Sequence, residues 1–104
     1  MWRVKVAASA EEDLKDIWSY IADRNAEAAN GVVKEITGKF AILRDYPQIG
    51  REQDKLLVNL RSFAVKQYFI FYQPIQDGVE ILRILHGSRD IERLFENLFD
   101  SLNE

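Results

Sequence analysis

Residues 56–90, LLVNLRSFAVKQYFIFYQPIQDGVEILRILHGSRD, decide the fold of this chain. Alternation with a period of two predicts a strand over 56–63. A second strand is expected over 67–73, where an unbroken aromatic and β-branched run indicates that both faces are covered. A turn at Gly78 leads to a third strand over 79–86. Two hairpins in sequence form a three-stranded antiparallel meander.

The residues before the meander predict one strand and two helices. Alternation over 2–7 indicates a short strand with one buried face. Ser9 stands three residues before Glu12, the spacing of a capping box, so a first helix is expected over 10–23. A second helix is expected over 26–46. Because the link between the two helices is short, they are expected to form an antiparallel hairpin.

The remaining boundaries follow from capping and breaking residues. Asn25 suits the N-cap of the second helix, and Pro47 ends it. A polar loop over 47–55 leads into the meander. Asp90 caps a last amphipathic helix over 90–102. The apolar stripe of that helix comprises Ile91, Leu94, Phe95, Leu98 and Leu102. This order of elements predicts an α+β fold with a small sheet.

Composition restricts the class of protein. With 104 residues, 47% of them hydrophobic, the chain is expected to form one domain, 1–104, with its own core. Cysteine is absent, which excludes disulfides and thiolate metal sites and favours the reducing cytoplasm. The sequence has neither a secretory signal pattern nor a run long enough to span a membrane. No cofactor is expected.

The charge balance favours a protein partner. Fourteen basic and seventeen acidic residues give a net charge of −3. Proteins that bind phosphate backbones broadly carry an excess of Lys and Arg, because each neutralised phosphate releases counterions. The balance therefore counts against direct nucleic-acid binding, although it leaves room for a local basic site.

His86 is the single histidine, and it follows a predicted strand. It could act as a general base, or it could be hydrogen-bonded and shape the end of the strand. A triad can be written with Ser88 and Asp90, but three residues so close in sequence rarely align as one. Without cysteine or a second histidine, no metal site is expected.

Three arginines could converge near one end of the sheet. Arg61 lies on the first predicted strand, Arg83 on the third and Arg89 in the turn after it. Strict alternation places Arg83 on an otherwise apolar face, where an unpaired charge is costly. It therefore either pairs internally, with Asp90 or Glu80 for example, or binds a partner.

The following residues occur in a family's characteristic order: Pro47 and Gly50; Leu60 and Arg61; Tyr68, Ile70 and Tyr72; Ile81, Arg83, Ile84, His86, Gly87, Arg89 and Asp90. Their order and spacing resemble the RelE/ParE toxin superfamily of type II toxin–antitoxin modules. The resemblance covers nearly the whole chain. It also implies the same compact α+β arrangement of strand, helical hairpin, meander and C-terminal helix.

The superfamily holds two activities. RelE-like members cleave messenger RNA on the ribosome, whereas ParE-like members bind and poison DNA gyrase. The positions at which the nucleases carry reactive groups correspond here to Phe69, to Phe95 and to residues near Leu60 and Ser62. Of the reactive residues of the nucleases, this sequence keeps only the arginine, as Arg89. Phenylalanine has no proton to exchange and no charge to stabilise a phosphorane. The ParE-like branch is therefore predicted, without catalytic residues.

The resemblance also implies two partners. A ParD-like antitoxin would wrap the toxin with a helix and an extended segment, and DNA gyrase would be the target. An amphipathic helix needs an apolar groove. The candidates to line it are Trp18, Tyr20 and Phe40, each of which could equally be an ordinary core residue. Arg83, Arg89 and the acidic C-terminal helix are the candidates for contact with the target.

Two alternatives stay open from the sequence. The chain could be an mRNA interferase that uses Arg61, His86 and Arg89 in place of the usual set. It could also be a toxin-fold protein that still binds antitoxin but has lost toxicity.

Overall fold

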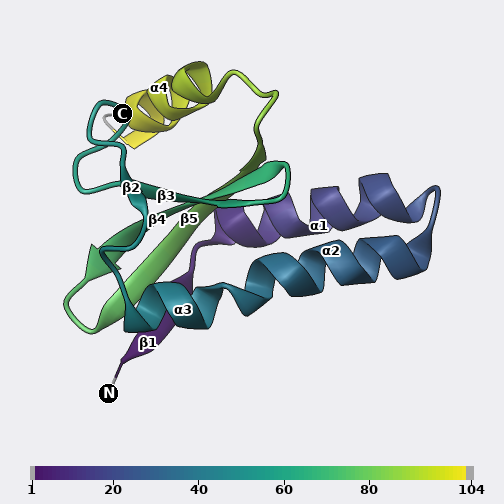
Figure 1. Ribbon diagram of the computed structural model, residues 1–104. Helices are drawn as coiled ribbons and strands as arrows, with labels where there is room; N and C mark the ends of the chain where they lie inside the picture. Colours follow the sequence, from purple (N-terminus) through teal and green to yellow (C-terminus); the bar gives the residue numbers. More distant parts are fainter. Residues whose placement is uncertain (1, 103–104) are drawn as a thin grey trace.

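The computed structural model describes residues 2–102, with side chains described up to Asn97. Helices cover both faces of one five-stranded sheet, so the predicted α+β fold is confirmed (Figure 1). In chain order the elements are β1 (Arg3–Val6), α1 (Ala8–Ala22), α2 (Ala26–Gly38), α3 (Phe40–Asp45), β2 (Arg51–Glu52), β3 (Arg61–Val65), β4 (Tyr68–Ile75), β5 (Gly78–His86) and α4 (Ile91–Leu102). The predicted stripe positions Leu98 and Leu102 have side chains outside the described residues.

The sheet has the strand order β1-β5-β4-β3-β2. Strands β3, β4 and β5 pair antiparallel, so the predicted meander is confirmed. Strand β1 pairs in parallel with β5, from Arg3 opposite Gly78 to Val6 opposite Ile81. Gly78 has φ 148°, and a Cβ there would lie 1.8 Å from the carbonyl oxygen of Arg3. Only glycine fits this close approach of the first strand to the last.

The predicted strand over 56–63 is wrong in its first half. Residues 56–60 form a loop, and β3 begins at Arg61. Asn59 turns the chain with a positive φ of 66°, and its N–H donates to Asp54 Oδ1 at 2.9 Å. The leucines of this loop pack on the apolar cluster under α4, so the sequence alternates as it would in a strand. Residues 56–60 nevertheless do not pair with a neighbouring strand. The predicted loop before them contains the two-residue strand β2, which pairs with β3.

The predicted capping box at the start of the first helix is wrong. Helix α1 begins two residues earlier than predicted, and its N-cap is Ala7, whose side chain makes no capping hydrogen bond. Ser9 lies inside the helix, and its hydroxyl donates to the carbonyl oxygen of Leu82 at 2.7 Å. A bond to a distant strand has replaced the local bond to Glu12 that the spacing suggested.

The predicted helix over 26–46 is two helices. Its start is as expected, because Asn25 Oδ1 accepts from a backbone N–H three residues on, at 3.0 Å. The helix breaks after Gly38, a residue that disfavours helix by about 1 kcal/mol relative to alanine. After the break, α3 places Phe40 and Leu43 in the core, where they are 9% and 0% exposed.

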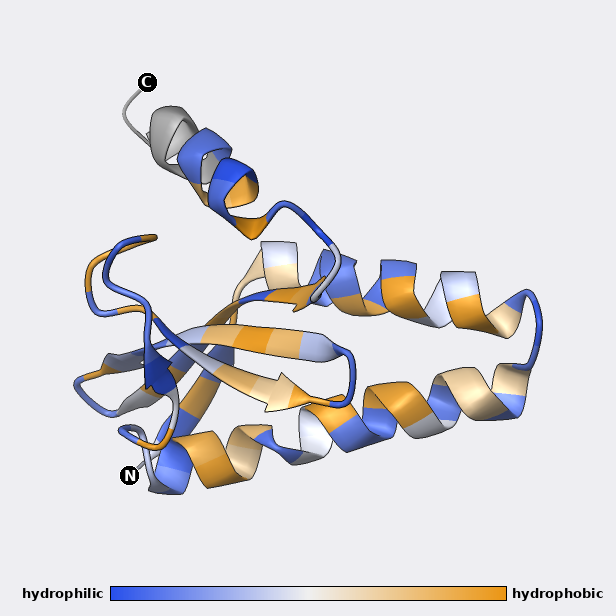
Figure 2. Cartoon of the chain, turned by 45° about the horizontal axis from the view of Figure 1, so that its top comes forward, coloured by the Kyte–Doolittle hydropathy of each residue, from blue (hydrophilic) through white to orange (hydrophobic). Residues whose placement is uncertain are grey.

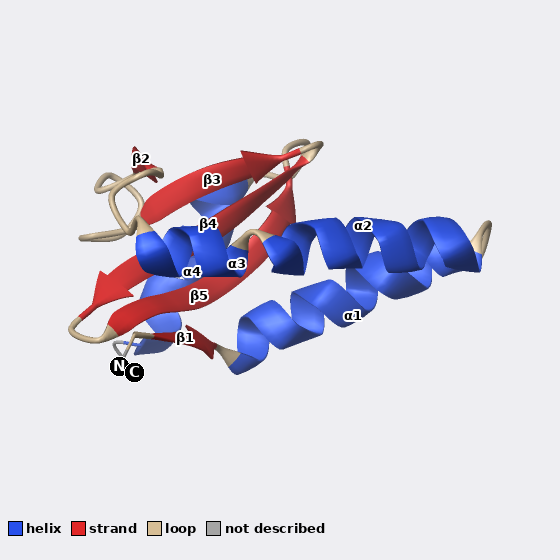
Figure 3. Ribbon diagram, turned by 60° about the horizontal axis from the view of Figure 1, so that its bottom comes forward, coloured by secondary structure: helices blue, strands red, loops and turns tan. Residues whose placement is uncertain are grey.

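Two apolar cores lie on opposite faces of the sheet (Figures 2 and 3). The hairpin-side core, under α1, α2 and α3, comprises Ala10, Ile36, Phe40, Leu43, Val65, Ile70, Tyr72, Val79, Ile81 and Ile84. The α4-side core comprises Leu60, Phe71, Leu85 and Phe95. Among residues 2–102, no helix combines the length and the apolar character needed to cross a membrane.

A β-bulge changes which face the residues of β5 occupy. Tyr72 lies opposite Ile81, but the preceding Phe71 lies opposite Arg83, so Leu82 is the extra residue. Strict alternation predicted Arg83 on the face of Ile81. The bulge instead places Arg83 opposite Phe71, which belongs to the α4-side core. It also twists the end of β5 relative to its beginning.

Tyr72 ties the meander to the loop that follows α3. Its side chain is fully buried, and its hydroxyl accepts from the Gly50 N–H at 2.8 Å and donates to the Pro47 carbonyl at 2.9 Å. Burial raises the pKa of Tyr72, although the bond from Gly50 and the charge of Arg61 lower it. A Cβ at residue 50 would lie 2.4 Å from the hydroxyl oxygen, so the loop needs glycine there.

The substitution Tyr72→Phe should lower the free energy of unfolding by about 1–3 kcal/mol, because the buried N–H of Gly50 would lose its acceptor. Denaturant titration measures the change. Tyr68→Phe, on the same strand but less buried, is the matched control. Equal losses in the two variants would contradict the role given to the Tyr72 hydroxyl.

Candidate functional site

Side chains of helix α1 form hydrogen bonds with the backbone of β5 beyond the point where its pairing with β1 ends. Strand β1 covers β5 only as far as Ile81. Beyond that point the Ser9 hydroxyl donates to the Leu82 carbonyl at 2.7 Å, and the Asp13 carboxylate accepts from the Ile84 N–H at 2.9 Å. Ser9 and Asp13 lie one helical turn apart, so both side chains reach the same edge. They replace the hydrogen bonds that a longer β1 would make.

Arg83 is paired internally, with Asp13. Its Nε donates to Oδ2 at 2.8 Å and its Nη2 to Oδ1 at 3.0 Å, a bidentate pair. The hydrogen bonds to Asp13 raise the pKa of Arg83 despite its partial burial. The side chains are 20% and 12% exposed. Internal pairing was one of the two expectations, but the expected partners, Asp90 and Glu80, were wrong, because α1 packs closer to this edge than either.

A cavity of about 460 Å³, here called the edge cavity, opens between α1 and the end of β5. It brings together three residues that the sequence singled out, Tyr20, His86 and Arg89. Tyr68 and Asp16 also line it. Burial, followed by the nearby Tyr20 hydroxyl, raises the pKa of Tyr68. Tyr20 is 70% exposed, and Arg89 is exposed as well, so the cavity offers aromatic and cationic groups to a partner.

His86 is held by hydrogen bonds on both ring nitrogens. The Ser88 N–H donates to Nδ1 at 3.0 Å and the Ser88 hydroxyl lies 2.7 Å from the same atom, which assigns the proton to Nε2. Nε2 faces Gln67 Oε1 at 3.3 Å, and the ring stands edge-on to Tyr68 at 5.3 Å. Asp90 instead accepts from a backbone N–H of α4. The carboxylate that a Ser/His/Asp triad needs is therefore not bonded to this histidine.

Arg61 does not join the other arginines. It lies opposite Tyr72, whereas His86 lies opposite Tyr68, four residues or about 13 Å along β4. Its guanidinium donates to the carbonyl oxygens of Gln48 and Gly50, at 3.1 and 2.7 Å. Arg61 thus fixes the loop before β2, and the expected three-arginine cluster is not formed.

The three residues proposed to line an antitoxin groove lie apart. Phe40 belongs to the hairpin-side core, so its placement in a surface groove is wrong. Trp18 is 41% exposed and donates from Nε1 to Asn30 Oδ1 of α2 at 2.7 Å. Tyr20 faces the edge cavity instead. Residues two positions apart lie on different sides of a helix, so Trp18 and Tyr20 cannot line one narrow groove.

The positions where the related nucleases carry reactive groups lie under α4. Leu60 and Phe95 are 1% and 3% exposed members of the α4-side core, and Phe69 packs against it. Ser62 is 6% exposed, and its hydroxyl accepts from Gln53 at 2.9 Å. This face of the sheet is a packed core. Among the described residues no group of histidine and carboxylate side chains could hold a metal ion.

Two residues of this site, Asp13 and Asp16, are not among those that the sequence predicted to be functional. Both lie on α1, among other charged residues. The spacing of Ser9 and Asp13, one turn apart on a helix that directly follows an edge strand, was the available signal.

The comparisons with known proteins agree with this architecture. Residues 4–91 match the model of the family described as "ParE toxin of type II toxin-antitoxin system, parDE". The chain belongs to the ParE toxin family. The resemblance to the ParE-like branch of the superfamily is thereby confirmed, and the chain is a type II toxin.

Two relatives from Caulobacter vibrioides support this membership. Toxin ParE1 is 29% identical over 85 residues, which cover 81% of this chain and 88% of that protein. Toxin ParE3 is 29% identical over 92 residues, which cover 88% and 92%. A solved structure, "Chromosomal ParDE TA system from P. aeruginosa", superposes with a TM-score of 0.71 at 20% identity and covers 83% of this ParE-family chain and 96% of its own. At that identity the match shows the fold.

The substitution Asp13→Ala should lower the free energy of unfolding of this ParE-family toxin by about 3 kcal/mol, because it leaves the Arg83 charge and the Ile84 N–H without their acceptor. Asp16→Ala, at an exposed position of the same helix, should change it by less than about 0.5 kcal/mol. Thermal or denaturant unfolding compares the two. Similar stabilities would show that Asp13 does not hold α1 to β5.

Proposed function

We propose that this ParE toxin acts by binding DNA gyrase in the cytoplasm, without catalysis of its own, and that a cognate ParD-like antitoxin neutralises it. Membership of the ParE family supports the class of target. The names of the relatives support the class of antitoxin, since one solved structure with this fold is titled a ParDE system.

The observation that carries the proposal is the packing under α4. Leu60, Ser62, Phe69 and Phe95 occupy the positions of the nuclease's reactive groups, and they are buried or pack against the α4-side core. A ribonuclease needs charged and proton-exchanging groups open to the phosphate. A face that is both apolar and covered favours an action through binding.

The mRNA-interferase alternative receives less support from the geometry. Of its three residues, His86 and Arg89 line the edge cavity, but Arg61 is held by loop carbonyls near the other end of β4. A toxin fold that has lost toxicity would have the same geometry, and the activity assay below separates it from an active toxin.

The surfaces for the two partners follow from exposure. Arg89 is exposed at the mouth of the edge cavity and remains our candidate for target contact. Arg83 was the other candidate, but its charge is already neutralised by Asp13. Trp18 and Tyr20 remain candidates for antitoxin contact. They lie on α1 in the hairpin, whose far end projects beyond the sheet (Figure 3).

Purified toxin, freed from its antitoxin, should inhibit plasmid supercoiling by gyrase and trap cleaved DNA, and added antitoxin should reverse the effect. Arg89→Glu should weaken inhibition about tenfold or more while antitoxin binding is kept. Absence of inhibition at a large excess of toxin over enzyme would refute gyrase as the target. A ribosome-dependent cleavage assay would then test the interferase alternative.

Trp18→Ala and Tyr20→Ala should each weaken antitoxin binding about tenfold or more, because exposed aromatic side chains commonly anchor protein interfaces. Calorimetry or surface plasmon resonance measures the affinity. Tyr46→Ala removes a comparably exposed aromatic residue, 67% exposed beyond the end of α3, and should leave the affinity unchanged. The hairpin is the wrong surface if all three variants behave alike.

A further inference from the structure

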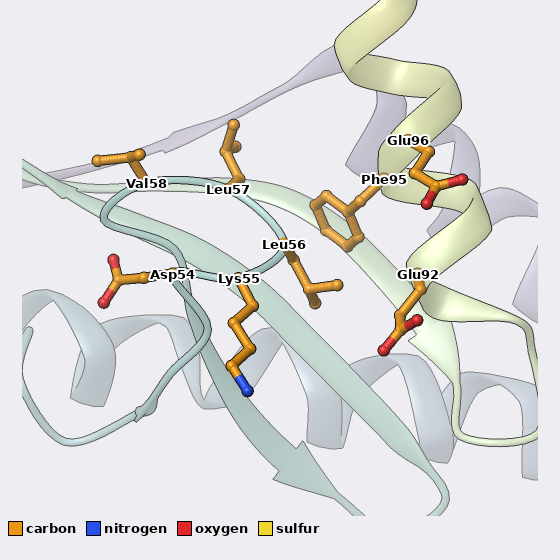
Figure 4. A pocket seen from close by; sticks show the side chains of 8 residues that line it. All are labelled: Asp54, Lys55, Leu56, Leu57, Val58, Glu92, Phe95 and Glu96. Carbon is orange, nitrogen blue, oxygen red and sulfur yellow. The ribbon is translucent and has the colours of Figure 1, made fainter.

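A groove of about 690 Å³ lies between α4 and the loop of residues 54–58 (Figure 4). Figure 4 shows Leu56 of the loop beside Phe95 of α4. Leu57 and Val58 extend the apolar surface, and Val58 is 69% exposed. The groove therefore has an apolar floor that is open to a partner, on the face of the sheet opposite the helical hairpin.

Carboxylate side chains line the groove beside its apolar residues. Glu92 and Glu96 lie one turn apart on α4, on either side of Phe95 in the sequence, and Asp54 lies on the loop. Lys55 also lines the groove. Asp54 already accepts from a backbone N–H of its own loop. None of the ion pairs among the described residues involves Glu92 or Glu96.

No ion pair among the described residues offsets the charges of Glu92 and Glu96, although Arg93 lies on the same helix. Like charges one turn apart on a helix repel each other. Glu92 lies in the first turn, where the helix dipole offsets this cost, but Glu96 lies a turn further on, where that effect has faded. A cationic side chain placed between them from outside would relieve the repulsion.

We propose that this acidic groove binds a segment of the toxin's protein target in which an apolar side chain is flanked by lysine or arginine. The inference rests on the proposed function, since an enzyme that handles DNA carries lysine and arginine on its working surface. The carboxylates complement that charge and steer the encounter, while the partly exposed Leu56 and Leu57 and the exposed Val58 supply the apolar anchor site. The groove lies on the face of the sheet opposite the hairpin that is proposed for the antitoxin.

A peptide titration tests the chemistry of the groove independently of gyrase. Acetyl-Lys-Leu-Leu-Lys-amide should shift the backbone amide signals of residues 54–58 and of Glu92–Glu96 in NMR spectra of the whole toxin, whereas acetyl-Glu-Leu-Leu-Glu-amide should not. The double variant Glu92→Lys/Glu96→Lys should lose the response to the cationic peptide. Equal responses to both peptides, or an unchanged response in the variant, would overturn the proposal.

A supercoiling assay tests whether gyrase is the protein that binds in the acidic groove. Glu92→Lys/Glu96→Lys should weaken inhibition of gyrase about tenfold or more, and the milder Glu92→Gln/Glu96→Gln should lie between it and wild type. The control Glu12→Lys/Asp23→Lys changes the net charge equally, at exposed positions of the hairpin. Circular dichroism and thermal unfolding of every variant report correct folding.

The outcomes of the assay separate the two proposals. If wild type and Glu92→Lys/Glu96→Lys inhibit equally, the groove does not bind the target although gyrase remains the target. If the control loses as much inhibition as the groove variant, overall charge and not the groove is responsible. If wild type does not inhibit at all, gyrase is refuted, and the peptide titration alone decides whether the groove binds cationic segments.

Discussion

The pairing of Asp13 with the last strand is the constraint on which the arrangement of helices and sheet depends. One carboxylate accepts two hydrogen bonds from Arg83 and one from the Ile84 backbone. These hydrogen bonds give an acceptor both to a backbone N–H at the edge of β5 and to the largely buried guanidinium of Arg83. Neither the N–H nor the charge is therefore left without a partner. They also fix how α1 lies along β5, and that position determines the wall of the edge cavity. Arg83 is therefore part of the structural framework, whereas Arg89 is exposed in the turn after β5.

The two faces of the sheet differ in how they are packed. The hairpin-side core holds most of the large buried side chains and joins three helices to the sheet. The α4-side core is smaller and depends on one helix and a loop without regular structure. Phenylalanine and leucine occupy positions where the related nucleases carry reactive groups, and they form part of this packed core. The groove beside α4 is a surface feature of the same face.

Sequence patterns were sufficient for the architecture and insufficient for its long-range contacts. The meander, the cap at Asn25 and the final helix are set by local alternation, capping and turn residues, and these were predicted. Residues 56–60 alternate like a strand because their leucines reach a core, which a local pattern cannot distinguish from pairing. The bulge at Leu82 breaks the alternation that placed Arg83, and no residue near it signals the break. Ser9 and Asp13 act on partners about 70 residues away, so their roles depend on a topology that local spacing does not specify.

The parallel pairing of β1 with β5 has a consequence for the timing of synthesis. Arg3–Val6 can find its partner only after Gly78 to Ile81 have been made. At roughly 5–20 residues per second, the first strand waits several seconds on the ribosome without its neighbour. The bonds from Ser9 and Asp13 must wait equally long. A partly synthesised chain therefore lacks the finished sheet edge, and the fold of the toxin is complete only after β5 has been translated.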